Sequence, residues 1–208
     1  MVKVKICGIH SSNEAKKAIE YGADFLGLLI EIPETNLSLN PTEAKKIISH
    51  NNKGKFIILT IEDDPIKLLN LIEYISPWGI QLLNPTKTNV EYLSKNCDIK
   101  IIPVVHITNK NDESKIELYC EADYILLDSK LGHHLGGTGK VHDWNLSKKI
   151  VKNNNIPIIL AGGLNESNVK GAISKVKPYA VDAESSLRNN MGFRDLLKVK
   201  KFIDKAKN

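Results

Sequence analysis

Short apolar segments of β type alternate with segments of helical periodicity from one end of the chain to the other. Eight such strand–helix pairs fit within the 208 residues, and this repeat is typical of a parallel sheet whose strands are buried on both faces. The predicted strands are 2–7, 24–30, 56–60, 80–83, 100–106, 124–127, 156–160 and 179–183. The predicted helices are 13–21, 41–49, 65–75, 88–95, 112–120, 144–152, 166–175 and 196–207, and Pro41 suits the first position of its helix.

This repeat favours an α/β fold of the (β/α)8 type, the TIM barrel, as one domain that spans residues 1–208. Periodicity does not show whether the sheet closes on itself, so an open, doubly wound sheet is the alternative. No low-complexity segment or linker interrupts the pattern, and we therefore do not expect two domains.

Composition and charge exclude several classes of protein. No run of about 18 apolar residues is present, and in the N-terminal segment Lys3 and Lys5 alternate with apolar residues, unlike a signal peptide. The three cysteines contain no CxxC pair, which indicates a reducing, cytoplasmic setting. The net charge is +5, but the lysines are dispersed over predicted helix faces. We therefore expect no membrane or nucleic-acid partner, and a preference for small anionic substrates.

Two candidate catalytic residues stand at predicted strand ends, where (β/α)8 barrels carry their active sites. Cys7 follows the first strand, and a cation such as Lys5 would favour its thiolate, which can act as a base. Asp128 follows the sixth strand and could act as an acid if a dry pocket raises its pKa. The alternatives are an inert buried thiol and a structural carboxylate.

The glycine-rich loop after the seventh strand, beside the end of the eighth, suggests a phosphate site. Gly162 and Gly163 precede a helix expected from about Glu166, and backbone amides at such a turn can bind an anion. The alternative is an ordinary tight turn. The other polar or glycine positions at these strand ends are Asp182, Ser185, Ser186, Gly136, Gly137 and Gly139.

The histidines do not predict a metal site. His133 and His134 are adjacent, so they do not converge easily on one ion, and no acid-rich segment accompanies them. We interpret them, and also His106 and His142, as ordinary loop or structural residues.

Four ordered motifs resemble those of one enzyme family. They are Lys5-Ile6-Cys7-Gly8; Leu126-Leu127-Asp128-Ser129 with Gly136-Gly137-Thr138-Gly139 and Asp143-Trp144; Leu160-Ala161-Gly162-Gly163-Leu164-Asn165 with Asn168-Val169; and Val181-Asp182 with Gly192 and Asp195. In this order, over nearly the whole chain, they are similar to the signatures of the phosphoribosylanthranilate isomerases, (β/α)8 barrels of tryptophan biosynthesis.

The resemblance implies an Amadori rearrangement of N-(5-phosphoribosyl)anthranilate, an intramolecular oxidoreduction that converts an aldose-type amine into a ketose-type amine. Asp128 would be the acid and Cys7 the base, with no metal or organic cofactor. Substrate and phosphate would be bound by Lys5, Asp182, Gly162, Gly163, Ser185 and Ser186, with Gly136, Gly137 and Gly139 in a mobile loop. The partner is then a small sugar phosphate, and the chain could be a monomer or a homodimer.

Three places depart from the family pattern, the first being Gln81-Leu82-Leu83-Asn84 after the fourth strand. Leu37 occupies the place of an arginine that meets the anthranilate carboxylate, and neither Arg188 nor Arg194 is near it in the sequence, so we expect no local substitute. If the eighth strand continues, Glu184 lies on the same side as Asp182. A carboxylate about 4 Å from a phosphate charge costs roughly 4 kcal/mol at an effective dielectric near 20.

Glu184 leaves three alternatives: it points outward, the phosphate binds elsewhere, or the substrate differs. An active isomerase therefore stands beside a barrel that binds or rearranges another sugar phosphate, or serves as a non-catalytic regulatory protein. Retention of both Cys7 and Asp128 favours the enzyme.

Overall fold

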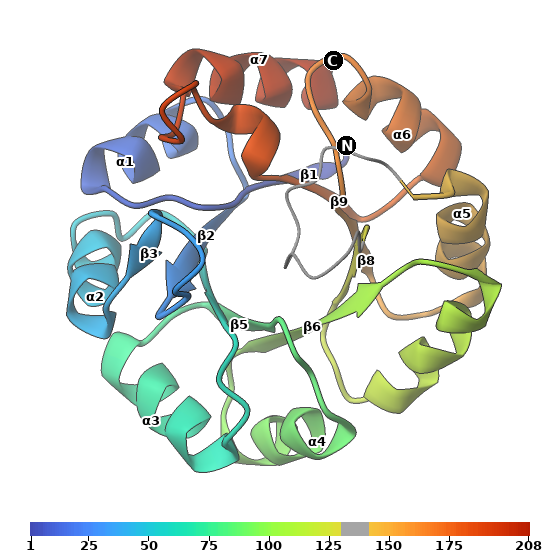
Figure 1. Ribbon diagram of the computed structural model, residues 1–208, viewed down its shortest axis with the longest axis horizontal. Helices are drawn as coiled ribbons and strands as arrows, with labels where there is room; N and C mark the ends of the chain where they lie inside the picture. Colours follow the sequence, from blue (N-terminus) through green and yellow to red (C-terminus); the bar gives the residue numbers. More distant parts are fainter. Residues whose placement is uncertain (130–141) are drawn as a thin grey trace.

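The computed structural model describes residues 1–129 and 142–208, whose strands form one parallel sheet. The strand order is β1-β9-β8-β7-β6-β5-β4-β2-β3, and β1 also pairs with β2. This last pairing closes eight strands into a ring, while the short β3 pairs only with β2 (Figure 1). The (β/α)8 barrel is confirmed and the open sheet is wrong. The strands are β1 Lys3–Ile6, β2 Phe25–Ile30, β3 Ser38–Leu39, β4 Phe56–Thr60, β5 Gly79–Leu82, β6 Lys100–His106, β7 Ile125–Asp128, β8 Ile158–Leu160 and β9 Ala180–Ala183.

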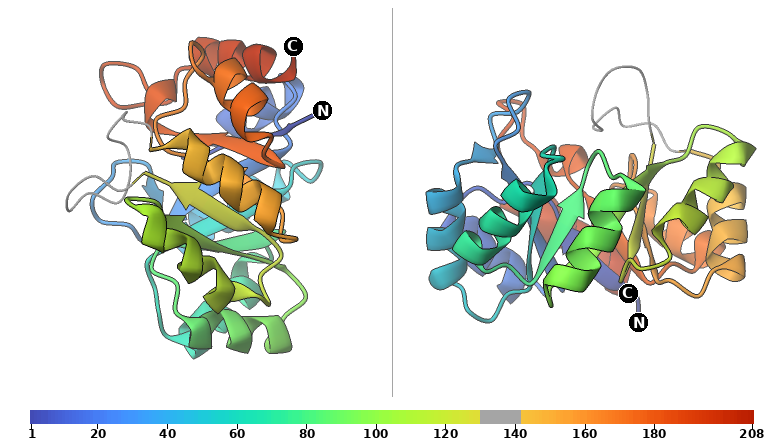
Figure 2. Two further views of the ribbon diagram at one scale, coloured as in Figure 1. Left: turned by 90° about the vertical axis from the view of Figure 1, so that its right-hand side faces the viewer. Right: turned by 90° about the horizontal axis from the view of Figure 1, so that it is seen from below.

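Helices surround the ring of strands and cover its outer face (Figures 1 and 2). They are α1 Ser12–Glu20, α2 Pro41–Ser49, α3 Pro65–Ile75, α4 Lys87–Asn96, the 3₁₀ helix η1 Lys110–Tyr119, α5 Trp144–Asn153, α6 Val169–Val176, the 3₁₀ helix η2 Ser185–Leu187 and α7 Leu196–Lys207. Pro41 begins α2 as predicted, after a capping box between Asn40 and Glu43. None of the described helices is long and apolar enough to cross a membrane.

Alternation along each strand produces two apolar layers. On β4, for example, Ile57 packs inside the ring, and Ile58 packs in the layer between strands and helices. Inside the ring, Ile57 joins Ile102, Leu126 and Ile159 from three other strands. The barrel is therefore filled by side chains and is not a channel.

An aromatic cluster closes one end of the barrel. The rings of Phe25 and Trp78 lie 5.0 Å apart, and those of Tyr124 and Tyr179 lie 5.3 Å apart. A contact of 5.9 Å between Trp78 and Tyr124 joins the two pairs. All four residues begin or precede strands, so they block the amino end, and the opposite end is left for a site (Figure 2).

The predicted and observed elements agree to within three residues at nearly every boundary, with three differences. The sequence analysis missed β3 and η2, which have only two and three residues. The segment after β6 is a 3₁₀ helix, and it begins at a capping box between Asn109 and Asp112. The α6 helix begins at Val169, not near Glu166, because the Asn165 side chain accepts hydrogen bonds from the N–H groups of Ser167 and Asn168 and holds a turn there.

Candidate active site

A buried ion pair joins two neighbouring strands inside the barrel. Lys5 on β1 is in register with Asp182 on β9, and Lys5 Nζ lies 3.1 Å from Asp182 Oδ1. The Lys5 side chain has no exposed surface. Burial disfavours its ammonium form, but Asp182 and Cys7 outweigh this effect and raise the pKa of Lys5. The interior therefore carries a fixed positive charge on the side of β1 that also carries Cys7.

Cys7 directly follows β1 and extends its pairing with β9, because its N–H donates to the carbonyl of Ala183 at 3.0 Å. Its side chain is 3% exposed and belongs to the apolar layer inside the ring. Burial raises the pKa of Cys7 to about 12, against the attraction of Lys5 and Arg194 for the thiolate. The thiol is therefore protonated at neutral pH, and it requires an additional cation nearby to act as a base.

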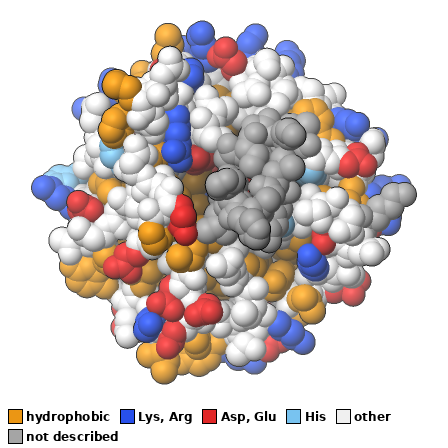
Figure 3. All heavy atoms as spheres, in the orientation of Figure 1, with side chains coloured by type: hydrophobic (Ala, Val, Ile, Leu, Met, Phe, Trp, Pro, Cys, Tyr) orange, Lys and Arg blue, Asp and Glu red, His pale blue; other side chains and the backbone are white. Residues whose placement is uncertain are grey.

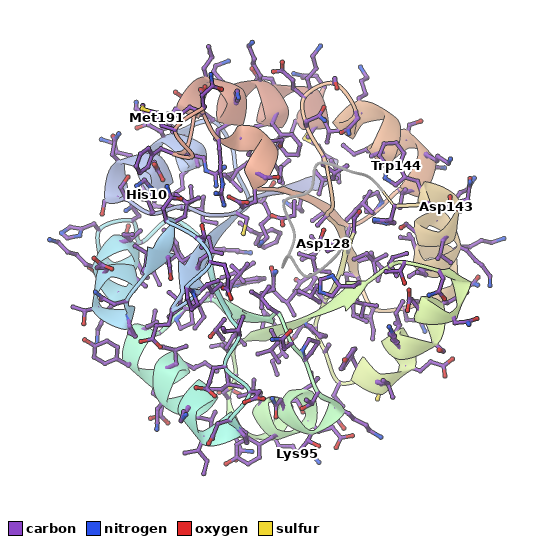
Figure 4. The ribbon with its side chains drawn as sticks, in the orientation of Figure 1. His10, Lys95, Asp128, Asp143, Trp144 and Met191 are labelled. Carbon is purple, nitrogen blue, oxygen red and sulfur yellow. The ribbon has the colours of Figure 1, made fainter. Side chains whose placement is uncertain are left out.

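Asp128 ends β7 and lies near the centre of the ring (Figure 4). Its Oδ1 accepts a hydrogen bond of 2.7 Å from the N–H of Ser129. Burial raises the pKa of Asp128 to about 6, and the charges of Asp182 and Glu184 add to this effect. Since roughly a tenth of such carboxyl groups are protonated at pH 7, Asp128 can donate a proton at physiological pH.

The Cys7 and Asp128 side chains lie in one electrostatic environment. The same three charged residues, Lys5, Asp182 and Glu184, shift the pKa of both groups. Both groups therefore lie within electrostatic range of the same charged residues at the carboxyl end of the barrel.

The raised pKa of Asp128 makes stability depend on pH. Because the folded state holds this proton up to about pH 6, and the unfolded chain only to about 3.8, stability falls as pH rises between these values. An asparagine side chain carries no charge at any pH, so Asp128→Asn should match the wild type near pH 4 and exceed it by about 2 kcal/mol near pH 8. Urea denaturation at both pH values measures this, with Asp204→Asn on α7 as an exposed control. An equal difference at both pH values would show that the Asp128 carboxylate is well solvated.

The glycine pair after β8 borders a small recess. Gly162 has a φ of +84°, and a Cβ built on it would lie 2.2 Å from Ser129 Oγ, so only glycine fits beside the residue that follows Asp128. Gly162, Gly163, Ser185 and Asp128 line a recess of about 50 Å³. This volume holds the centres of a few water-sized groups.

Ser186 does not line this recess. Its hydroxyl donates to the carbonyl of Leu164 at 2.6 Å, and this bond ties the loop after β9 to the loop after β8. Three other predicted binding residues, Gly136, Gly137 and Gly139, lie outside the described residues, as do His133 and His134.

Glu184 does not continue the eighth barrel strand, but it lines the same recess as Asp182. β9 ends at Ala183, and Glu184 has φ −133° and ψ −74° at the start of η2. Its Oε1 lies 2.6 Å from Arg188 Nε and 3.3 Å from Arg194 Nη2. The two guanidinium groups compensate this carboxylate, so a nearby phosphate would not meet an unpaired negative charge.

Arg188 lies near the segment that carries Leu37, although the two are far apart in the sequence. Its Nη2 lies 3.4 Å from Oγ1 of Thr35, two residues before Leu37 and 153 positions away in sequence. Leu37 itself is fully buried, and a Cβ on Gly8 would lie 3.0 Å from both Leu37 and Glu184. The loops after β1, β2 and β9 therefore meet beside Cys7.

His142 has a structural role. Nδ1 lies 2.9 Å from Ser129 Oγ and Nε2 lies 2.5 Å from Ser147 Oγ, and burial lowers its pKa to about 4. The neutral ring thus links β7 to α5. Among the described residues, no group of histidine, cysteine and carboxylate side chains could hold a metal ion.

The sequence analysis did not select two buried polar residues, Arg194 and Gln81, as residues of the site. Arg194 has no exposed side-chain surface and donates to the carbonyl oxygens of Cys7, Gly8 and Glu184. One feature of the sequence could have identified Arg194. The chain is rich in lysine, and both of its arginines lie within seven residues of each other. Gln81 on β5 is 3% exposed, and its Oε1 has no hydrogen-bond partner among the described residues, which leaves an acceptor facing the interior.

Known proteins resemble this chain over its whole length. The family model of N-(5'-phosphoribosyl)anthranilate (PRA) isomerase matches residues 4–205. The chain is 33% identical to the N-(5'-phosphoribosyl)anthranilate isomerase of Methanosarcina acetivorans, over 99% of this chain and 93% of that protein. It is 34% identical to the corresponding protein of a Sulfurihydrogenibium species, over 99% of this chain and 98% of that one.

Solved structures agree with these sequence matches. The phosphoribosyl anthranilate isomerase of Thermotoga maritima superimposes with a TM-score of 0.89 at 31% identity, covering 100% of this chain and 99% of that one. Another structure of a phosphoribosyl anthranilate isomerase contains reduced 1-(o-carboxyphenylamino)-1-deoxyribulose 5-phosphate, and matches with a TM-score of 0.86 at 29% identity over 100% and 99% of the two chains.

A closed barrel whose carboxyl end gathers a carboxylic acid, a thiol and a buried ion pair defines an acid–base enzyme on the (β/α)8 scaffold. The sequence and structural matches agree on which one. The chain belongs to the N-(5'-phosphoribosyl)anthranilate isomerase family, the isomerases of tryptophan biosynthesis.

Proposed function

We propose that this protein converts N-(5'-phosphoribosyl)anthranilate into 1-(2-carboxyphenylamino)-1-deoxyribulose 5-phosphate, the isomerisation step of tryptophan biosynthesis. The family match over residues 4–205 supports the reaction class. The observation that carries the proposal is the common surroundings of Asp128 and Cys7, which share Lys5, Asp182 and Glu184 as electrostatic neighbours. A single sugar can then meet both a proton donor and a proton acceptor.

Asp128 supplies the proton that opens the ribose ring. Its carboxyl group protonates the furanose ring oxygen while the bond between C1 and that oxygen breaks, and the amine nitrogen donates its lone pair to form a protonated Schiff base. The pKa of about 6 supports this role, because a carboxyl group of ordinary acidity would hold almost no proton at neutral pH.

Cys7 then removes the proton from C2. The C2–H electron pair becomes the C1–C2 double bond, and the Schiff-base nitrogen recovers its electrons, so the scheme requires no metal or organic cofactor. The iminium charge about 4 Å from the thiol would favour the thiolate by roughly 4 kcal/mol, equivalent to about three pKa units. Together with Lys5 and Arg194, it moves the pKa of the Cys7 thiol from about 12 toward the physiological range.

The phosphate occupies the recess between the loops after β8 and β9. Backbone N–H groups of Gly162 and Gly163 and the hydroxyl of Ser185 are its donors in this proposal, and their presence around one recess supports it. Ser186 acts through its bond to Leu164, which holds the two loops together. Lys5 and Asp182 contribute as a buried pair beside the substrate, not as direct phosphate ligands, because Lys5 Nζ is engaged with Asp182.

The same proposal extends to the domain organisation, the cellular location and the oligomeric state of the protein. Residues 1–208 work as one barrel domain, supported by a family match that covers nearly all of them. The three free thiols support a cytoplasmic location. Both a monomer and a homodimer fit, and a solved relative is itself described as a dimeric enzyme of which monomers were generated.

The direct test is turnover of freshly prepared substrate. Purified wild-type protein should quench substrate fluorescence with a kcat/KM of at least about 10⁴ M⁻¹s⁻¹, and its expression should restore growth of an isomerase-deficient tryptophan auxotroph. Protein carrying both Cys7→Ala and Asp128→Asn, prepared in the same way, controls for contaminating activity. Folded wild-type protein that neither turns over the substrate nor restores growth would contradict the proposal.

A further inference from the structure

Around the recess after β8 and β9, the described residues leave one cation accessible to a ligand. Three carboxylates gather there, Asp128, Asp182 and Glu184. Of the positive groups, Lys5 has no exposed side-chain surface and pairs with Asp182. Arg194 is equally buried and donates to backbone carbonyls. The Arg188 side chain is 26% exposed. On the face drawn in Figure 3, basic and acidic atoms lie side by side near the centre.

Arg188 is held in place from three directions. Its Nε donates to Glu184 at 2.6 Å, and its Nη2 donates to Thr35 at 3.4 Å. Its backbone carbonyl accepts from Lys198 Nζ at 2.7 Å, and the residue forms an antiparallel bridge with Arg194. A guanidinium has five N–H donors, and within the described chain its side chain makes only those two bonds. Donors therefore remain for a ligand.

The substrate of the proposed reaction carries two separate anionic groups, a phosphate and an aromatic carboxylate. In the proposed reaction the phosphate occupies the recess after β8 and β9. The carboxylate must therefore lie elsewhere in a mouth that already holds three acids. Lys5 pairs with Asp182 and the two arginines with Glu184, so Asp128 is the acid that most opposes a further carboxylate, and a cation with free donors would offset this repulsion.

The segment beside Arg188, residues 31–37, contains no lysine or arginine of its own. Leu37 is completely buried and packs with Leu29 and Ile32, and its N–H donates to Thr35 Oγ1 at 3.2 Å. Thr35 thus links Arg188 to the segment that carries Leu37. An aromatic ring lying against this segment would direct its carboxylate toward the guanidinium, whose planar fork matches a carboxylate.

We propose that Arg188 binds the carboxylate of the aromatic part of the substrate and orients that ring, with Glu184 and Thr35 fixing its side chain. In this proposal the cation that meets the carboxylate is supplied by the loop after β9. The segment after β2 cannot supply it, because the residue there is the buried, uncharged Leu37. This inference rests on the proposed function, since it assigns a residue to one part of that substrate.

The test compares two ligands that differ only in the carboxylate. They are reduced 1-(o-carboxyphenylamino)-1-deoxyribulose 5-phosphate and the same compound made from aniline. Isothermal titration calorimetry of Arg188→Ala should show a Kd about 10- to 100-fold weaker for the carboxylated ligand and a change below about threefold for the aniline ligand. Arg188→Lys should recover part of the loss, because a single ammonium keeps the charge without the bidentate geometry.

Lys200→Ala on α7 is the matched control, since it removes one positive charge that is paired with Asp204 away from the mouth. It should change neither Kd by more than about twofold. Equal losses for both ligands in Arg188→Ala would indicate a general structural role and overturn the inference, and so would an unchanged Kd for the carboxylated ligand. Wild-type protein that binds neither ligand would instead overturn the proposed function and this inference together.

Discussion

Asp128→Asn should lower kcat/KM for N-(5'-phosphoribosyl)anthranilate by about 10³- to 10⁴-fold, and Cys7→Ala should lower it at least as far. Asparagine preserves the shape of Asp128 but has no proton to donate, and alanine leaves no acceptor for the C2 proton. Because both side chains lie in one charged cluster, removing the second after the first should cost far less than the first removal. Steady-state fluorescence assays of the two single variants and the double variant measure this.

Two other thiols of the chain are the controls for Cys7. Cys97 is partly buried, Cys120 is exposed, and neither lies at the carboxyl end of a strand. Cys97→Ser and Cys120→Ser should retain wild-type kcat/KM to within about twofold. Loss of activity in either, or near-normal activity in Cys7→Ala, would contradict the assignment of Cys7 as the base.

Lys5→Met should be the most destabilising single change at the site, by about 3–5 kcal/mol in the free energy of unfolding. Lysine and methionine have similar length, so the loss comes from leaving Asp182 buried beside an uncharged group. The same change removes a cation that favours the Cys7 thiolate, so turnover should also fall. Chemical denaturation at constant pH measures the first effect and the fluorescence assay the second.

The matched control lies on the same strand. Lys3 Nζ is 3.0 Å from Asp24, but its side chain is 47% exposed. Lys3→Met should therefore change stability by no more than about 1 kcal/mol. Adding Asp182→Leu to Lys5→Met should restore most of the lost stability, because no buried charge then remains. Equal stability of the Lys3 and Lys5 variants would show that the interior pair is solvated.

The sequence predicted the barrel because local patterns specify it. Continuous apolar runs such as 56–60, between helices that begin at Pro41 and Pro65, identify buried parallel strands without any knowledge of their partners. Cys7 and Asp128 could be selected because parallel strands bring their carboxyl ends to one edge. Closure of the sheet could not be predicted, since the pairing of β1 with both β2 and β9 is a long-range contact.

The surroundings of each group were decided only by tertiary structure. The sequence places Lys5 two positions before Cys7. The buried ion pair of Lys5 with Asp182, however, depends on the register of β1 with β9. Glu184 was difficult to reconcile with an anionic ligand until Arg188 and Arg194 were found on either side of it. Arg188 reaches Thr35 across 153 positions of sequence. The sequence by itself determined which residues stand at the strand ends, because periodicity is local, whereas pKa values and charge pairing depend on groups that only folding brings together.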